Sequence, residues 1–206
     1  MYSYGFELEG FYRNSEITVP PENYPHDGFP GLLEFRSTGH GDLSRQYFDM
    51  LDQFTKPNIN FNYCDFNTCV WTFTPEQKRE LRNRNHGKTP ATIRNIYGYK
   101  PKALGNKTIA SFQINISELT HKAYTDNTGK HHHDEFGLLD VPFIIKSLDE
   151  EFSAEIKKAG RQKGEYCIKS ERLEYRSLPN FVAKFTIPEI DQLLMRINRA
   201  LQSKEG

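Results

Sequence analysis

The chain has no surplus of charge of either sign. Its 27 lysine and arginine residues equal its 27 aspartate and glutamate residues over 206 positions, so the overall charge does not favour nucleic acid as a partner. Long apolar runs are also missing: the chain has no stretch of about 18 apolar residues that could cross a membrane, and no apolar signal segment opens it. We expect a cytoplasmic protein with no membrane partner.

Cysteine and apolar residues are both scarce. Cys64, Cys69 and Cys167 are an odd number without the spacing of metal ligands, so we expect free thiols, with a turn between Cys64 and Cys69. Apolar residues make up only 36% of the chain, but 15 phenylalanines and 11 tyrosines supply large buried areas. The length suffices for a single domain over residues 1–206.

Four short segments alternate apolar residues with charged, amide or hydroxyl residues. They are Phe6–Glu9, Leu33–Arg36, Phe112–Ser117 and Arg172–Arg176. Side chains alternate between the two faces of a strand, so each segment predicts one apolar and one polar face. If the strands join in phase, ten side chains gather on what we call the polar face: Glu7, Glu9, Glu34, Arg36, Gln113, Asn115, Ser117, Arg172, Glu174 and Arg176.

The remaining pattern predicts helices that cover the opposite, apolar face. Helices are expected to start near Asp42, Thr74, Asp140 and Thr186, where capping residues or prolines precede apolar residues at helical spacing. Strands are expected over residues 4–12, 31–38, 108–117 and 164–178, with a hairpin joining 59–63 to 70–73. This order predicts an α+β domain with a largely antiparallel, curved sheet between helices and a polar active-site face.

Two polar segments are insertions in this pattern. Residues 78–107 hold nine lysines or arginines and one acid, Glu80. They predict a surface for an acidic partner or for nucleotide phosphates, with a solvated helix and loop as the alternative. Residues 124–136 include three adjacent histidines, His131 to His133. Such histidines cannot all point at one metal from a regular element, so we expect a polar loop.

The carboxylates of the polar face suggest a chemistry. Like charges a few ångströms apart repel by roughly 1–4 kcal/mol per pair, so the cluster must protonate, pair with arginine or bind cations. Carboxylate oxygens suit Mg²⁺ or Mn²⁺, which bring substrate phosphates with them, and arginine binds phosphate with two hydrogen bonds. These are the groups of phosphoryl transfer. The alternative is a ladder of cross-strand ion pairs on a solvated face.

Several of these segments resemble motifs of the carboxylate–amine ligases, the superfamily that includes glutamate–cysteine ligase and glutamine synthetase. The segments are Gly5–Gly10, with the pattern Gly-x-Glu-x-Glu, Asp27–Arg36, Ala110–Ser117 and Gly160–Asn180. The chain is most similar to the small amidoligases that phages encode. The resemblance implies a glutamine synthetase-like catalytic fold, and the cytoplasm of the host cell if a phage encodes the protein. Gln113 departs from the pattern, because a metal-binding histidine is usual there.

The resemblance also implies roles for residues of the polar face. Metal ions would bind the four glutamates Glu7, Glu9, Glu34 and Glu174. The catalytic arginines would be Arg176, Arg172 and Arg36. The nucleotide would contact Gln113, Asn115, Ser117, Arg161 and Lys163. In this family ATP, with Mg²⁺ or Mn²⁺, phosphorylates a carboxylate, and an amine then displaces the phosphate to give an amide. The substrates would be small-molecule or peptide carboxylates and amines.

Two other functions stay open at this point. A catalytically weakened relative could bind a nucleotide or a host protein through residues 78–107. The other alternative is a metal-dependent nuclease. Glu34 and Glu174 are each followed by arginine at the second position, where a nuclease would more often have lysine.

Overall fold

This computed structural model describes much of both ends of the chain and little of its middle. The described residues are 2–13, 32–38, 41–57, 59, 64–72, 74–76, 79, 83, 107–118, 123–125, 131–133, 140–169 and 172–202. Most of the basic segment 78–107 lies outside them, and so does the surface expected for an acidic partner. No helix within these ranges has the length and apolar character needed to cross a membrane.

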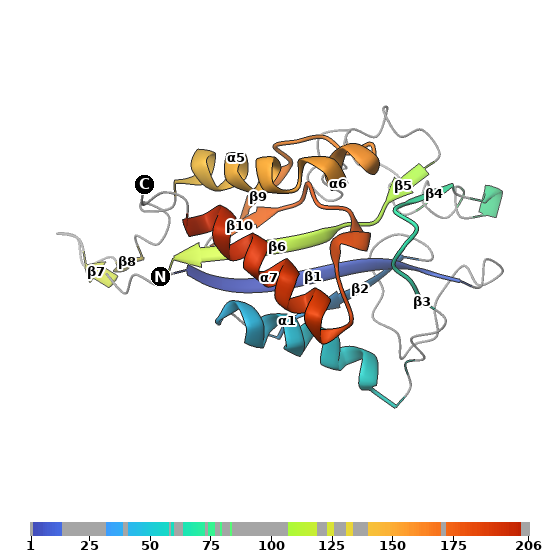
Figure 1. Ribbon diagram of the computed structural model, residues 1–206, viewed down its shortest axis with the longest axis horizontal. Helices are drawn as coiled ribbons and strands as arrows, with labels where there is room; N and C mark the ends of the chain where they lie inside the picture. Colours follow the sequence, from blue (N-terminus) through green and yellow to red (C-terminus); the bar gives the residue numbers. More distant parts are fainter. Residues whose placement is uncertain are drawn as a thin grey trace.

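The main sheet has the strand order β2-β1-β6-β10-β9, and these neighbours pair antiparallel. The strands are β1 Tyr2–Tyr12, β2 Leu32–Arg36, β6 Phe112–Glu118, β9 Tyr166–Lys169 and β10 Arg172–Tyr175. The short strand β3, Cys64–Asp65, pairs with the C-terminal end of β1. Segments from opposite ends of the sequence therefore meet in one sheet (Figure 1). The predicted α+β class with a largely antiparallel sheet is confirmed.

Helices lie on one side of this sheet. The longer ones are α1 Leu43–Asp52, α5 Val141–Glu151 and α7 Ile187–Gln202, and the short ones are η1 Gln53–Thr55, α6 Ser153–Lys158 and η3 Asn180–Val182. In Figure 1, α7 crosses β1 and β6, with α1 and α5 to either side of it. Apolar side chains of strands and helices form one buried core that includes Phe6, Leu8, Phe112, Ile114, Leu173, Tyr47, Leu148 and Ile197. The period of two in the strands thus separates a helix-covered face from the polar face.

The helix starts follow the capping residues expected from the sequence. The carboxylate of Asp42 accepts a hydrogen bond from Arg45 N at 2.9 Å, and that of Asp140 accepts one from Phe143 N at 3.1 Å. Each bond satisfies an amide that the first helical turn leaves without a backbone partner. The helix expected over residues 140–158 is present but divides at Phe152 into α5 and α6.

One strand prediction was wrong: the segment 164–178 forms the antiparallel pair β9–β10 instead of one strand. The hairpin expected between 59–63 and 70–73 falls largely outside the described residues. Within them, β3 pairs with β1 and β4, Val70–Thr72, pairs with β5, Lys107–Ile109. The turn between β3 and β4 was predicted correctly: Asp65 accepts hydrogen bonds from the amides of Asn67 and Thr68 at 2.8 and 3.1 Å. This turn carries the chain from one sheet to the other.

The prediction of an irregular loop over 124–136 was also wrong in part. Strand β8, His131–His133, pairs antiparallel with β7, Ala123–Thr125. A short hairpin satisfies backbone groups that a loop would leave to water.

Candidate functional site

The strand register brings the polar segments together in phase. Glu7 of β1 lies between Arg36 of β2 and Gln113 of β6, and Glu9 lies opposite Glu34. In the neighbouring row, Asn115 lies between Gly5 of β1 and Glu174 of β10. Residues directly opposite in an antiparallel pair project from the same face. The predicted convergence of the four glutamates on one side of the sheet therefore follows from the pairing.

The glutamates of the polar face are withdrawn from solvent. Their exposed fractions are 8% for Glu7, 6% for Glu9, 8% for Glu34 and 0% for Glu174. A ladder on a solvated face would leave such side chains largely exposed. Buried carboxylates need hydrogen bonds or opposite charges to stay ionised, so their partners decide what this site can do.

Glu9 is held by neutral donors. Its Oε2 accepts hydrogen bonds from the backbone amide and the hydroxyl of Ser111, both at 2.6 Å. Its Oε1 accepts one from Gln113 Nε2 at 2.9 Å. Three donors on one carboxylate stabilise the ionised form. They also occupy most of the lone pairs that a metal ion would use.

The other three glutamates each have an arginine nearby. Arg36 Nε donates to Glu34, and Arg176 Nε lies 3.0 Å from Glu174 Oε1. Arg172 Nη2 lies 3.9 Å from Glu7 Oε1, a looser ion pair. The Nε of Arg172 is buried and has no hydrogen-bond acceptor among the described residues. Arg172 therefore keeps donor capacity for a ligand.

A cavity of about 240 Å³ opens on the polar face. It is lined by Gly5, Phe6, Glu7, Arg36, Ser37, Thr38, Asn115 and Arg172. Gly5 contributes no side chain to its row, opposite Asn115, which leaves room between two guanidiniums and one carboxylate. Such a lining suits a small group with negative charge or with charges of both signs.

The donor set of the polar face decides whether a divalent ion could bind there. No three carboxylate, imidazole or thiol groups of the described residues converge on one point. Amide oxygens add to the set, because Asn115 Oδ1 and Gln113 Oε1 are buried without a hydrogen-bond partner in the described part of the chain. The Nδ2 of Asn115 donates to Glu7 Oε1 at 3.3 Å, so the side-chain amide of Asn115 lies beside that carboxylate. Mg²⁺ commonly takes one or two protein carboxylates and completes its shell with water and phosphate, so the residues fit such an ion.

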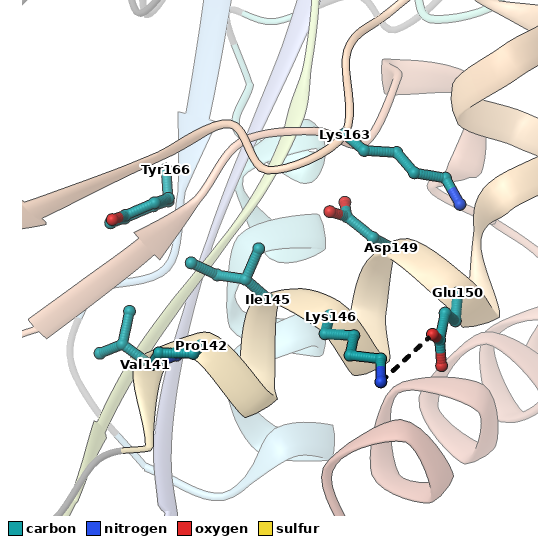
Figure 2. A pocket seen from close by; sticks show the side chains of 8 residues that line it. All are labelled: Val141, Pro142, Ile145, Lys146, Asp149, Glu150, Lys163 and Tyr166. Carbon is teal, nitrogen blue, oxygen red and sulfur yellow. Dashed lines mark ion pairs between the residues drawn. The ribbon is translucent and has the colours of Figure 1, made fainter.

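The predicted nucleotide contacts do not all meet at this cavity. Arg161 donates through Nε to Ser177 O at 2.9 Å and through Nη2 to Arg176 O, so it clamps the backbone beside the catalytic candidate Arg176. Lys163 lines a separate cavity between α5 and β9 (Figure 2). Ser117 is half-buried opposite Ser3, near one end of β6. The roles of these three in nucleotide binding stay predictions.

Two residues of this region were missed in the sequence. Ser111 binds Glu9, and its position two residues before Gln113 continues the same alternation, so extending the period would have found it. Cys167 lies opposite Glu174 across the β9–β10 pair. Only the hairpin register places it there, and no local signal could have.

Burial keeps the Cys69 thiol from acting as an activated nucleophile. Cys64, Cys69 and Cys167 are all free, as expected. Burial raises the pKa of the Cys69 thiol, against the opposing charge of Arg161. A protonated thiol is a weak nucleophile, which favours chemistry through the carboxylates and arginines.

Comparisons with protein-family models, with curated proteins and with solved structures gave no match to this chain. The likeness to the carboxylate–amine ligases therefore rests on the residues of the polar face and on their arrangement.

Proposed function

We propose that this chain is an ATP- and Mg²⁺-dependent carboxylate–amine ligase with a glutamine synthetase-like catalytic fold. One observation carries the proposal: Glu7, Asn115, Arg36 and Arg172, from four strands, line one cavity in a buried polar face. Strands hold these groups at fixed spacing, as a reaction with several charged participants requires.

The reaction would proceed in two steps. A carboxylate oxygen of the acyl substrate attacks the γ-phosphorus of ATP, the bond to the ADP oxygen breaks, and an acyl phosphate forms. The amine then attacks the acyl carbon, phosphate leaves, and the nitrogen loses a proton to give the amide. Arg172 and Arg36 would bind the phosphoryl oxygens or the substrate carboxylate, and Arg176 would stabilise the charge near Glu174.

Glu7 and Asn115 are the best placed ligands for Mg²⁺, with Glu174 beside Asn115 in the same row. A bound ion would neutralise phosphate charge and thereby lower the repulsion that the carboxylate nucleophile meets. Glu34 and Glu9 already have strong donors, so they would support the site from its edge. The cavity of about 240 Å³ is below the usual range for drug-sized ligands, so it suits the reacting groups and not a whole nucleotide.

A turnover assay tests the proposal. Purified protein with ATP, Mg²⁺ and an amino-acid mixture should release ADP and phosphate, and added hydroxylamine should trap the acyl phosphate as a hydroxamate. Glu7→Gln and Arg176→Ala should each reduce turnover by at least about a hundredfold, because each removes charge stabilisation at the reacting centre. Arg199→Ala on α7 is the matched control and should retain activity. Unchanged turnover in both site variants would exclude this site.

One observation favours a second candidate, a nucleotide-binding protein without turnover. Three of the four glutamates already have an arginine at ion-pair distance and Glu9 has neutral donors, so most of the negative charge is compensated without an ion. This protein would bind a labelled ATP analogue and lose that binding in Arg172→Ala, yet release no ADP under any condition of the assay above.

A further inference from the structure

Among the described residues, strand β9 forms an edge of the main sheet. Its described strand partner is β10, and the strand order ends with β9. Arg176 N donates to Glu165 O at 2.8 Å, and hydrogen-bonded pairs alternate along an antiparallel ladder. Cys167 and Lys169 therefore direct their main-chain groups to β10, whereas Tyr166 and Ile168 direct theirs away from the sheet. Those two residues present the main-chain donors and acceptors that an added strand would use.

The same two residues expose large apolar side chains. Tyr166 is 47% exposed and Ile168 is 55% exposed. They lie opposite Tyr175 and Leu173, on the helix side of the sheet. Natural edge strands usually discourage pairing with proline, a bulge or charged side chains, lysine especially. Strand β9 has one such residue, Lys169, but neither proline nor a bulge. Two of its four side chains, Tyr166 and Ile168, are apolar and exposed.

A cavity of about 400 Å³ adjoins this edge. In Figure 2, Val141, Pro142 and Ile145 of α5 form one wall and Tyr166 lies across from them. Asp149 faces the cavity but is occupied, because it accepts hydrogen bonds from Tyr175 Oη and Gly164 N, both at 2.6 Å. The space beside the exposed edge is therefore mainly apolar.

The rim of the cavity carries two lysines, Lys146 and Lys163, beside the carboxylates of Asp149 and Glu150. Lys146 pairs with Glu150 at 3.9 Å. Lys163 has no carboxylate at ion-pair distance within the described ranges, and Figure 2 shows it on the other side of Asp149 from Tyr166. A ligand that fills the cavity would gain from an acidic group near Lys163.

We propose that β9 binds an extended peptide segment of a partner protein by strand addition. The segment would pair with the outward main-chain groups of Tyr166 and Ile168, place an apolar side chain against Ile145 and Tyr166, and bring an aspartate or glutamate to Lys163. A second copy of this chain is the alternative occupant, and the oligomeric state of the chain tests it. This inference does not depend on ligase activity.

Selection from a displayed library of random heptapeptides against the full chain tests the proposal. Enriched peptides should alternate apolar residues and carry an acidic residue near one end. Ile168→Pro removes an outward amide without touching the β10 ladder, and it should weaken their binding by about tenfold or more. Lys163→Glu should weaken it as well. Met195→Asp, at an exposed apolar position on α7, is the matched control and should bind normally.

Amide exchange in the unsubstituted protein keeps the test independent of how well Ile168→Pro folds. A bound peptide should slow exchange at Tyr166 and Ile168, while Cys167 is protected with or without it. Three results would overturn the proposal: no enriched peptide, peptides that leave both amides unprotected, or a dimer of the chain alone that Ile168→Pro dissociates. The last would assign the edge to a second copy.

Discussion

Single positions of β1 are tightly constrained, Gly10 on the core side of the sheet and Glu9 on the polar face. A methyl group at Gly10 would lie 2.5 and 2.6 Å from ring atoms of Phe66 and 3.1 Å from Asp65 O. The Phe66 ring packs on Phe35 and Phe54, with centroids 5.8 and 5.3 Å away, so it has little room to move. We expect Gly10→Ala to lower the free energy of unfolding by about 1–3 kcal/mol, measured by urea denaturation.

The control for this change is Gly160→Ala. Gly160 has a φ of 66°, but nothing lies within 4 Å of the added methyl. It isolates the conformational cost of the left-handed region, about 1 kcal/mol. A Gly10→Ala protein as stable as the parent would mean that Phe66 is not held in place.

Glu9 and Glu7 should behave differently although they are two residues apart. Glu9 accepts three hydrogen bonds, so Glu9→Gln turns an amide group towards the donors of Ser111 and Gln113. We expect a loss of about 2–3 kcal/mol in unfolding free energy. Glu7 has one amide donor at 3.3 Å and a loose ion pair, so Glu7→Gln should cost less than about 1 kcal/mol. The reverse order in urea denaturation would show that Glu7, and not Glu9, anchors the sheet.

At the scale of elements, the helices are tied together by a charge cluster around Arg196. This residue of α7 donates to Glu151 at 2.8 Å and to Glu155 at 2.6 Å, and its guanidinium lies 4.3 Å from the centre of the Phe152 ring. Burial raises the pKa of both carboxyls, but the hydrogen bonds and charges of the arginines outweigh it, and each pKa lies below its usual value.

This cluster makes part of the stability depend on pH. A lowered carboxyl pKa adds stability above the unfolded value, near 4.5, and that stability is lost as pH falls through the folded pKa. Arg196→Met should therefore cost about 1–2 kcal/mol near neutral pH and progressively less below about pH 4. Urea denaturation of both proteins from pH 7 to pH 3 measures the difference. A difference that stays constant over this range would assign the effect to packing on Phe152.

The elements also show which features a sequence can predict. Local signals located the helix starts at Asp42 and Asp140, because a capping side chain acts within three residues. The alternation in β1, β2, β6 and β10 placed the glutamates on one face. Pairing was harder: β4 joins β5 and β9 turns back on β10, and no local pattern specifies which distant strand a segment meets.

For the whole molecule, the main sheet separates the core, which helices cover, from the polar face and its cavity. The alternation alone predicts most side chains of the polar face, but not Cys167. The rows of side chains across the strands could not be predicted, because they depend on register: the cavity lies where Gly5 is opposite Asn115. The hydrogen bonds of Arg161 to the backbone of residues 176 and 177 could not be predicted either. Long side chains such as arginine reach several partners, so their role follows from neighbours that only the fold supplies.

Because the cavity is separate from the core, a ligand bound there should raise the stability of the folded protein without changing the core. A ligand that binds only the folded state raises its stability by about 2.7 kcal/mol at a hundred times its dissociation constant, which for a chain of this size is an increase of about 5 °C or more in melting temperature. We expect Mn²⁺ with a non-hydrolysable ATP analogue to produce this shift in the parent protein and in Arg199→Ala. Glu7→Gln should lose it, since Glu7 lies beside the side-chain amide of Asn115, and chelation of the metal should abolish it in every variant. A shift of equal size in Glu7→Gln would place the metal away from the cavity, because the core is unchanged by that substitution and only the polar face has lost a charge.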